Sequence, residues 1–125
     1  MNDEFEEING FKPSIRRSQV DEFTEDDAYV LLYGAGDFGH GYHALNASLP
    51  GKSTFPDGWG ELIVVEWVYW IFNHPQCYGE PDAQDGFDIY GEHNHVEGVV
   101  KVRQRHGIIY IATAYPLDMV FWEYE

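Results

Sequence analysis

The chain has 125 residues, of which 44% are apolar and 17% aromatic, and its formal net charge is −15. This length predicts a single domain over residues 1–125 that buries a sizeable core, with an acidic segment at 1–27 and the core at 28–125. The composition excludes an intrinsically disordered chain. The net charge argues against loose, non-specific binding to a nucleic-acid backbone, which needs a basic surface.

Three features bear on where the chain works. The longest apolar run, residues 62–72, is interrupted by Glu66 and is shorter than the roughly 20 residues that span a bilayer. The acidic N-terminus lacks the basic and then apolar pattern of a signal peptide. Cys77 is the single cysteine, so no intramolecular disulfide can form. We therefore expect a cytoplasmic protein without membrane contact, or an effector delivered by another route.

The first third of the chain is charged and then rich in turn formers. We expect the first dozen residues to be poorly ordered or wrapped on the body, and a short helix within residues 18–28. The apolar run at 29–33 predicts a strand, and the glycine-rich stretch at 34–43 predicts a loop. The glycine spacing of that loop resembles a dinucleotide-binding fingerprint, but the breakers at positions 41 and 50 exclude the helix that such a site needs.

The remaining elements predict a sheet with one buried helix on it. Residues 58–73 carry apolar side chains at helical spacing, although their β-branched content keeps a strand open as an alternative. Residues 75–98 are polar and rich in turn formers. A hairpin is predicted with arms at 99–104 and 108–113, and a last strand at 117–125. This order predicts an α+β fold with an antiparallel sheet and a short N-terminal helix or loop.

Three of the seven basic residues alternate along the predicted first hairpin arm: Lys101, Arg103 and Arg105. Alternate residues of a strand share one face. Two interpretations remain open for them. They form either a solvated edge strand or a local cationic strip that meets a polyanion.

Six histidines are present, and two pairs have close spacing: His40 with His43, and His93 with His95. A zinc site is not predicted, because the single cysteine lies far from both pairs in sequence and loop pairs without further ligands are weak evidence. His93 and His95 are interpreted as part of a polar loop. His74, next to Pro75, is interpreted as a helix-end residue that satisfies a late carbonyl.

A different set of residues fits RNA cleavage. Internal transphosphorylation needs a base for the 2′-OH, an acid for the 5′-oxygen and a cation for the charged phosphorane, and it needs no metal or cofactor. A neutral histidine suits the base near neutral pH, and a lysine suits the cation. His43 is followed nine residues later by Lys52 in a tight turn beside two hydroxyls, Ser53 and Thr54.

Two sequence blocks resemble one family. The first block contains Gly41-Tyr42-His43-Ala44 and Pro50-Gly51-Lys52-Ser53-Thr54-Phe55-Pro56 and ends at Trp59. The second block begins at Gly107 and contains Thr113-Ala114-Tyr115-Pro116. Over residues 29–117 the chain is similar to the bacterial EndoU nuclease domain of polymorphic and contact-dependent toxins. That resemblance implies an EndoU-like fold and a metal-independent RNA endonuclease that cuts at uridines and leaves 2′,3′-cyclic phosphate ends. It also implies a toxin module with RNA, single-stranded or tRNA, as substrate and an immunity protein as partner.

The resemblance assigns roles to individual residues. His43 matches the second family histidine and Lys52 the lysine, while Thr113 and Tyr115 would contact the uracil base. Ser53, Thr54, Lys101, Arg103 and Arg105 are the further candidates for substrate binding. The stretch at 29–34, where the family has its first histidine, has none. His40 is the candidate replacement.

Three hypotheses for function therefore stay open. The first is an EndoU-like endoribonuclease. The second is a catalytically impaired relative that binds RNA or a protein. The third is an acidic interaction protein, such as an inhibitor of a basic nuclease or an immunity-type partner.

Overall fold

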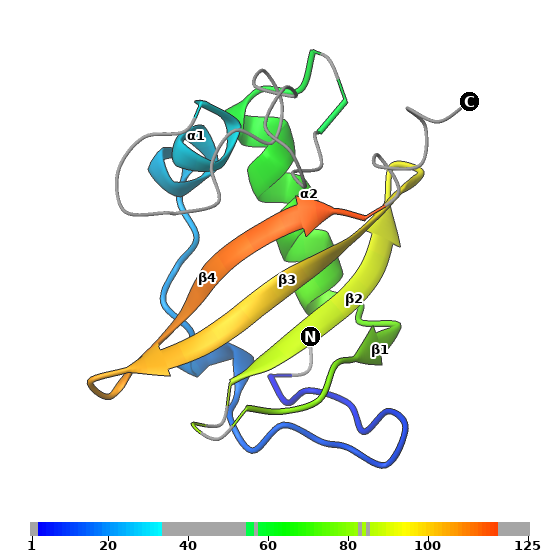
Figure 1. The fold of residues 1–125 in the computed structure, drawn as a ribbon, viewed down its shortest axis with the longest axis vertical. Helices are drawn as coiled ribbons and strands as arrows, with labels where there is room; N and C mark the ends of the chain where they lie inside the picture. Colours follow the sequence, from blue (N-terminus) through cyan, green and yellow to red (C-terminus); the bar gives the residue numbers. More distant parts are fainter. Residues whose placement is uncertain (1–2, 34–54, 57, 83, 85, 118–125) are drawn as a thin grey trace.

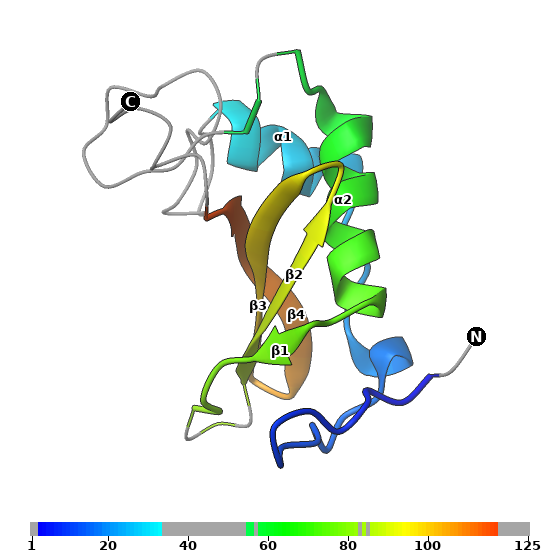
Figure 2. The same ribbon diagram turned by 90° about the vertical axis from the view of Figure 1, so that its right-hand side faces the viewer.

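The computed structural model describes residues 3–33, 55–56, 58–82, 84 and 86–117. Within them lie a short 3₁₀ helix, η1 (Arg17–Gln19), and two helices, α1 (Glu25–Tyr33) and α2 (Glu61–Asn73). The strands are β1 (Cys77–Tyr78), β2 (Phe87–His93), β3 (Val96–Arg105) and β4 (Ile108–Pro116). They pair antiparallel in the order β1-β2-β3-β4, and α2 lies across one face of the sheet (Figures 1 and 2). The α+β architecture with an antiparallel sheet is confirmed.

Helix α2 is the centre of the core, and the helix expected over residues 58–73 is confirmed. Its buried side chains follow helical spacing and come from Val64, Trp67, Val68, Ile71 and Phe72. The Trp67 indole N–H donates a hydrogen bond to the Val96 carbonyl oxygen at 3.1 Å. A Cβ at Gly98 would lie 2.2 Å from the Trp67 ring, so only glycine lets the helix pack this closely on the sheet. Neither described helix is long and apolar enough to cross a membrane.

The strand expected at residues 29–33 is wrong, because these residues form the second half of α1. The helix begins after a local cap. The Thr24 hydroxyl oxygen accepts from the Asp27 N–H, and the Asp27 carboxylate accepts from the Thr24 N–H at 2.8 Å. Acidic residues fill the first turn, where the helix dipole favours them. Ala28, Leu31 and Leu32 are buried at helical spacing, so packing against the core stabilises α1 in addition to the cap.

The hairpin expected around residues 99–113 is confirmed as β3 and β4. His106 and Gly107 form its turn with φ of +54° and +78°, as a two-residue type I′ hairpin requires. The interpretation of residues 75–98 as turn-rich holds for the described residues between β1 and β2 and for the turn at Asn94 and His95. It is wrong for β2 and the start of β3, which also lie in this range. Polar side chains alternate with buried ones along β2, which made the strand look like a loop.

The N-terminal segment is wrapped on the body, as one of the two alternatives expected. Phe5 is 1% exposed and meets the rings of Phe72 and Phe87 edge-on, each at 5.3 Å. The Arg17 guanidinium lies 4.4 Å from the Phe5 ring centroid. The N-terminal segment therefore belongs to the same core as α2 and the sheet. The helix expected within residues 18–28 is replaced by η1 and the start of α1, and the strand expected at 117–125 lies, beyond Leu117, outside the described residues.

Candidate functional site

The candidate site residues divide into two groups. His40, His43, Lys52, Ser53 and Thr54, together with the glycine-rich stretch at 34–43, lie outside the described residues. The other five candidates lie on the hairpin of β3 and β4: Lys101, Arg103, Arg105, Thr113 and Tyr115. The geometry of the second group can therefore be examined in detail.

The hairpin brings these residues to one face of the sheet. Lys101 is the cross-strand partner of Thr113, and Tyr115 is the partner of Val99. Odd-numbered residues of β3 from Val99 onward lie on the face away from α2, which we call the outer face, whereas Val100 and Val102 face the core. The Lys101 ammonium lies 5.8 Å from the centre of the Tyr115 ring.

A bulge in β4 decides this arrangement. Lys101 pairs with Thr113 but Val102 pairs with Ile111, so Ala112 is an extra residue in β4. Ile111 faces the core, and regular alternation would place Thr113 on the core side as well. The bulge shifts the alternation by one, and Thr113 and Tyr115 join Lys101 on the outer face.

Asp88 completes the cluster, and the sequence analysis missed it. It lies on β2 opposite Lys101, and its Oδ2 accepts a hydrogen bond from Lys101 Nζ at 3.0 Å. Arg103 Nη2 lies 3.0 Å from Asp88 Oδ1, and Arg103 Nε lies 3.6 Å from Asp82 Oδ2. We call Asp88, Lys101, Arg103, Thr113 and Tyr115 the outer-face cluster. Alternation of polar and apolar residues over 87–93 was the signal that could have found Asp88.

The charges of the cluster stabilise one another. Burial lowers the pKa of Lys101, but the hydrogen bond and charge of Asp88 outweigh it, so this pKa is raised above its ordinary value. Burial, helped by the Asp88 carboxylate, raises the pKa of the neighbouring Tyr90 phenol. Hydrogen bonds from the backbone N–H groups of Gln84 and Gly86 lower the pKa of Asp82. The cluster therefore holds two cations against the Asp88 carboxylate, and the Asp82 carboxylate lies beside it at Arg103.

Thr113 is unusual within the cluster. Its side chain is 2% exposed, and its hydroxyl oxygen is buried with no hydrogen-bond partner in the part of the chain that the structure describes. Burying a hydroxyl without a partner costs about 1–3 kcal/mol. Such a group in a native fold is a candidate for contact with a ligand. A ligand could reach it only if the side chains over it move.

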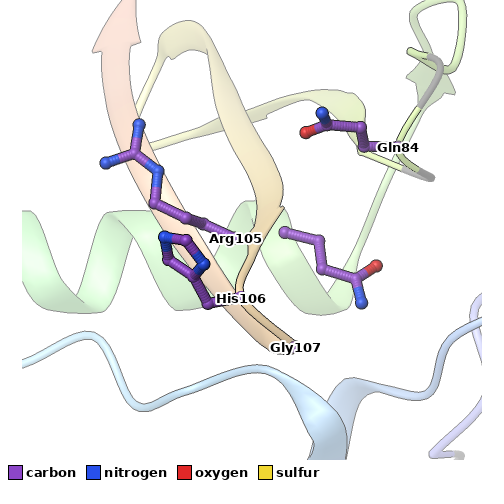
Figure 3. A pocket seen from close by; sticks show the side chains of 5 residues that line it. Gln84, Arg105, His106 and Gly107 are labelled. Carbon is purple, nitrogen blue, oxygen red and sulfur yellow. The ribbon is translucent and has the colours of Figure 1, made fainter.

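Arg105 lies at the far end of the strip and differs from the other two cations. It is exposed and has no ion pair with any described residue. It lines an open hollow of about 670 Å³ together with Gln84, Gln104, His106 and Gly107 (Figure 3). The side chains of Arg105 and His106 extend the same way from the turn, and Gln84 lies across the hollow. Cationic and amide donors at this end of the sheet suit an anionic group.

Two histidines form a separate group at the other end of the sheet. The Trp70 ring is stacked between the rings of His74 and His93, with centroid distances of 4.0 Å and 4.4 Å. His93 ends β2, so its interpretation as a loop residue is wrong, while His95 does lie in a turn. His74 Nδ1 lies 2.9 Å from the Trp70 carbonyl oxygen, which confirms its role at the helix end. Among the described residues, no three potential metal ligands are grouped.

The outer-face cluster is thus the part of the predicted site whose geometry is defined. It combines an aromatic ring, two cations and a hydroxyl on one face, which are the groups that contact bases and phosphates of RNA. Comparisons of the chain with protein-family models, with curated proteins and with solved structures found no match.

Proposed function

We propose that this protein is an EndoU-like endoribonuclease that binds RNA across the outer-face cluster and cleaves it at uridines. One observation carries the proposal. Thr113 and Tyr115, which the motif assigns to the base, share the outer face with Lys101, whose ammonium lies 5.8 Å from the Tyr115 ring. A base stacked on Tyr115 would place its phosphate within reach of Lys101 and Arg103.

The proposed reaction needs only groups of this chain and the RNA. His43 takes the proton of the 2′-OH, and the 2′-oxygen attacks the phosphorus. Lys52 stabilises the negative charge of the phosphorane. The bond between phosphorus and the 5′-oxygen breaks, and His40 gives a proton to that oxygen. The products are a 2′,3′-cyclic phosphate and a free 5′-hydroxyl, while Ser53 and Thr54 contact the substrate beside Lys52.

Asp88 gives the proposed surface selectivity. Because it already pairs with Lys101 and Arg103, an RNA phosphate must displace or share these contacts. Together with the net charge of −15, this weakens binding to arbitrary polyanions. Affinity must then come from contacts that only the correct base makes, such as stacking on Tyr115 and a hydrogen bond with Thr113.

The test is cleavage of a uridine-containing oligonucleotide by the purified full chain in the presence of EDTA. We expect products with cyclic-phosphate ends, and loss of at least about 100-fold in rate for His43→Ala and Lys52→Ala. Lys12→Ala is the matched control, because Lys12 is an exposed lysine that pairs with Glu4 away from the outer face. Equal inertness of the wild type and His43→Ala contradicts the catalytic proposal.

A second candidate function is RNA binding without cleavage. It is favoured by the absence of a histidine from residues 29–34, where the family has its first one. In that case the oligonucleotide binds but is not cut, and Tyr115→Leu weakens binding while Tyr29→Leu, a change at an exposed tyrosine of α1, does not. Measured turnover with cyclic-phosphate products excludes this alternative.

A further inference from the structure

A second surface feature lies on the side of the molecule that carries the two helices. It is a groove of about 360 Å³ between the segment that leads into α1 and the first turns of α2. Helix α2 lines it with Leu62, Val65 and Tyr69, and Leu62 is 68% exposed. Figure 2 shows α1 beside the first half of α2, and α2 forms one side of the groove. An exposed leucine in a groove presents apolar surface to water, and a partner can bury that surface.

The walls of the groove are fixed before any partner arrives. The Phe23 N–H donates a hydrogen bond to the Tyr69 hydroxyl at 2.7 Å, and the Phe23 side chain is buried. The Thr24–Asp27 cap fixes the start of α1. A preformed groove binds with less loss of conformational entropy than a mobile one.

The rim of the groove is acidic. Glu22, Glu25 and Asp26 line it, and none of them pairs with a basic side chain within the described ranges of the chain. Burial, together with the negative charges of Glu22 and Asp27, raises the pKa of Tyr69, which also lines the groove. The helix dipole accounts for acidic residues in the first turn of α1. It does not account for Glu22, which precedes the helix, or for the exposed Leu62 that lines the same groove.

We propose that this groove is a docking site for a basic, amphipathic segment of a partner protein. An apolar side chain of the partner packs on Leu62 and Val65, and its lysine or arginine side chains pair with the rim carboxylates. Charge complementarity selects this occupant, because an acidic peptide or a nucleic acid would meet like charge. The site lies on a different surface from the outer-face cluster, so it does not depend on the proposed nuclease function.

The test uses a labelled synthetic peptide of lysine and leucine with amphipathic helical spacing, titrated with the full chain. We expect the triple variant Glu22→Gln, Glu25→Gln, Asp26→Asn to raise Kd by about tenfold or more. The control triple Glu80→Gln, Glu92→Gln, Glu97→Gln removes the same charge from exposed positions elsewhere and should change Kd by less than about twofold. Leu62→Ser leaves the charge unchanged and should weaken binding by about fivefold or more.

Two results would overturn the proposal. Equal weakening by both triples, with no effect of Leu62→Ser, would show that the peptide binds only through net charge. A change of molecular mass on Leu62→Ser in sedimentation of the chain alone would identify a second copy as the occupant. RNA cleavage by the same variants should be unchanged, which separates failure of this proposal from failure of the nuclease proposal.

Discussion

Lys101 Nζ lies 3.0 Å from Asp88 Oδ2 across the paired strands β2 and β3, with both side chains largely buried on the outer face. The Asp88 carboxylate also meets Arg103, so one acidic residue holds two of the three cations proposed to meet RNA. Asp88 therefore competes with an RNA phosphate group for contact with Lys101 and Arg103. Removing its charge should therefore strengthen, not weaken, the affinity for RNA.

Asp88→Asn is the first prediction. We expect tighter RNA binding by about threefold or more and a steeper dependence of affinity on salt, because two cations are released for phosphate contacts. The measurement is fluorescence anisotropy of a labelled oligonucleotide across a salt series. Asp82→Asn is the control, because Asp82 is more exposed and lies 3.6 Å from Arg103, and its effect should be smaller. Weaker binding by Asp88→Asn would mean that Asp88 orders the cations and does not compete.

The three basic residues of β3 should contribute unequally to the salt dependence. Arg105→Gln removes a cation without a described ion pair, so it should lower the salt slope by about 0.7, the value for one single-strand phosphate contact. Lys101→Gln should lower it less, because Asp88 already neutralises this ammonium. Lys12→Gln serves as the control at a distant exposed lysine. An unchanged slope for both Arg105→Gln and Lys101→Gln would identify the strip as a solvated edge.

Thr113→Val should separate stability from recognition. It keeps the shape of the side chain and removes a buried hydroxyl without a described partner, so we expect stabilisation by about 1 kcal/mol in urea unfolding. Thr24→Val is the matched control and should destabilise the fold by about 1 kcal/mol, because it removes the cap of α1.

The same Thr113→Val substitution should reduce the preference for uridine, which cleavage of uridine and cytidine oligonucleotides would measure. An unchanged preference together with increased stability would mean that Thr113 is only a strand residue.

Alkaline pH should weaken the fold through Tyr78. Burial raises the pKa of Tyr78 to about 12, and its hydroxyl donates a hydrogen bond to the Glu6 carbonyl oxygen at 2.8 Å. Because the folded-state pKa is higher than the ordinary tyrosine pKa of 10.0, this stabilisation is complete below pH 10 and is lost as pH rises toward 12. Urea unfolding across this range should show the loss.

Tyr78→Phe tests the assignment. It should flatten the fall in stability over the same pH window, since a phenylalanine cannot ionise. Tyr29→Phe, at an exposed tyrosine, should leave the fall as in the wild type. Equal profiles for all three proteins would place the alkaline transition elsewhere.

Local sequence patterns predicted those helices and strands in which residue spacing and composition both favour the observed structure. Residues 58–73 combine helical spacing with a following proline, and the hairpin around His106 and Gly107 has two alternating arms and a turn that accepts positive φ. The helix α1 was missed because its apolar second half has strand-like composition, and the cap at Thr24 with burial of Leu31 and Leu32 decided otherwise. Strand β2 was missed because its polar residues, which alternate with buried ones, are also typical of a loop.

The sequence by itself determined the α+β class, helix α2, the β3–β4 hairpin and the alternation of Lys101 and Arg103 along one strand. Only the tertiary structure decided that Asp88 would pair with these cations and that Thr113 and Tyr115 would join them. Periodicity is a property of neighbouring residues, whereas pairing across strands depends on register. The register of β4 is shifted by one extra residue at Ala112, and that shift is defined only by the pairing of β4 with β3.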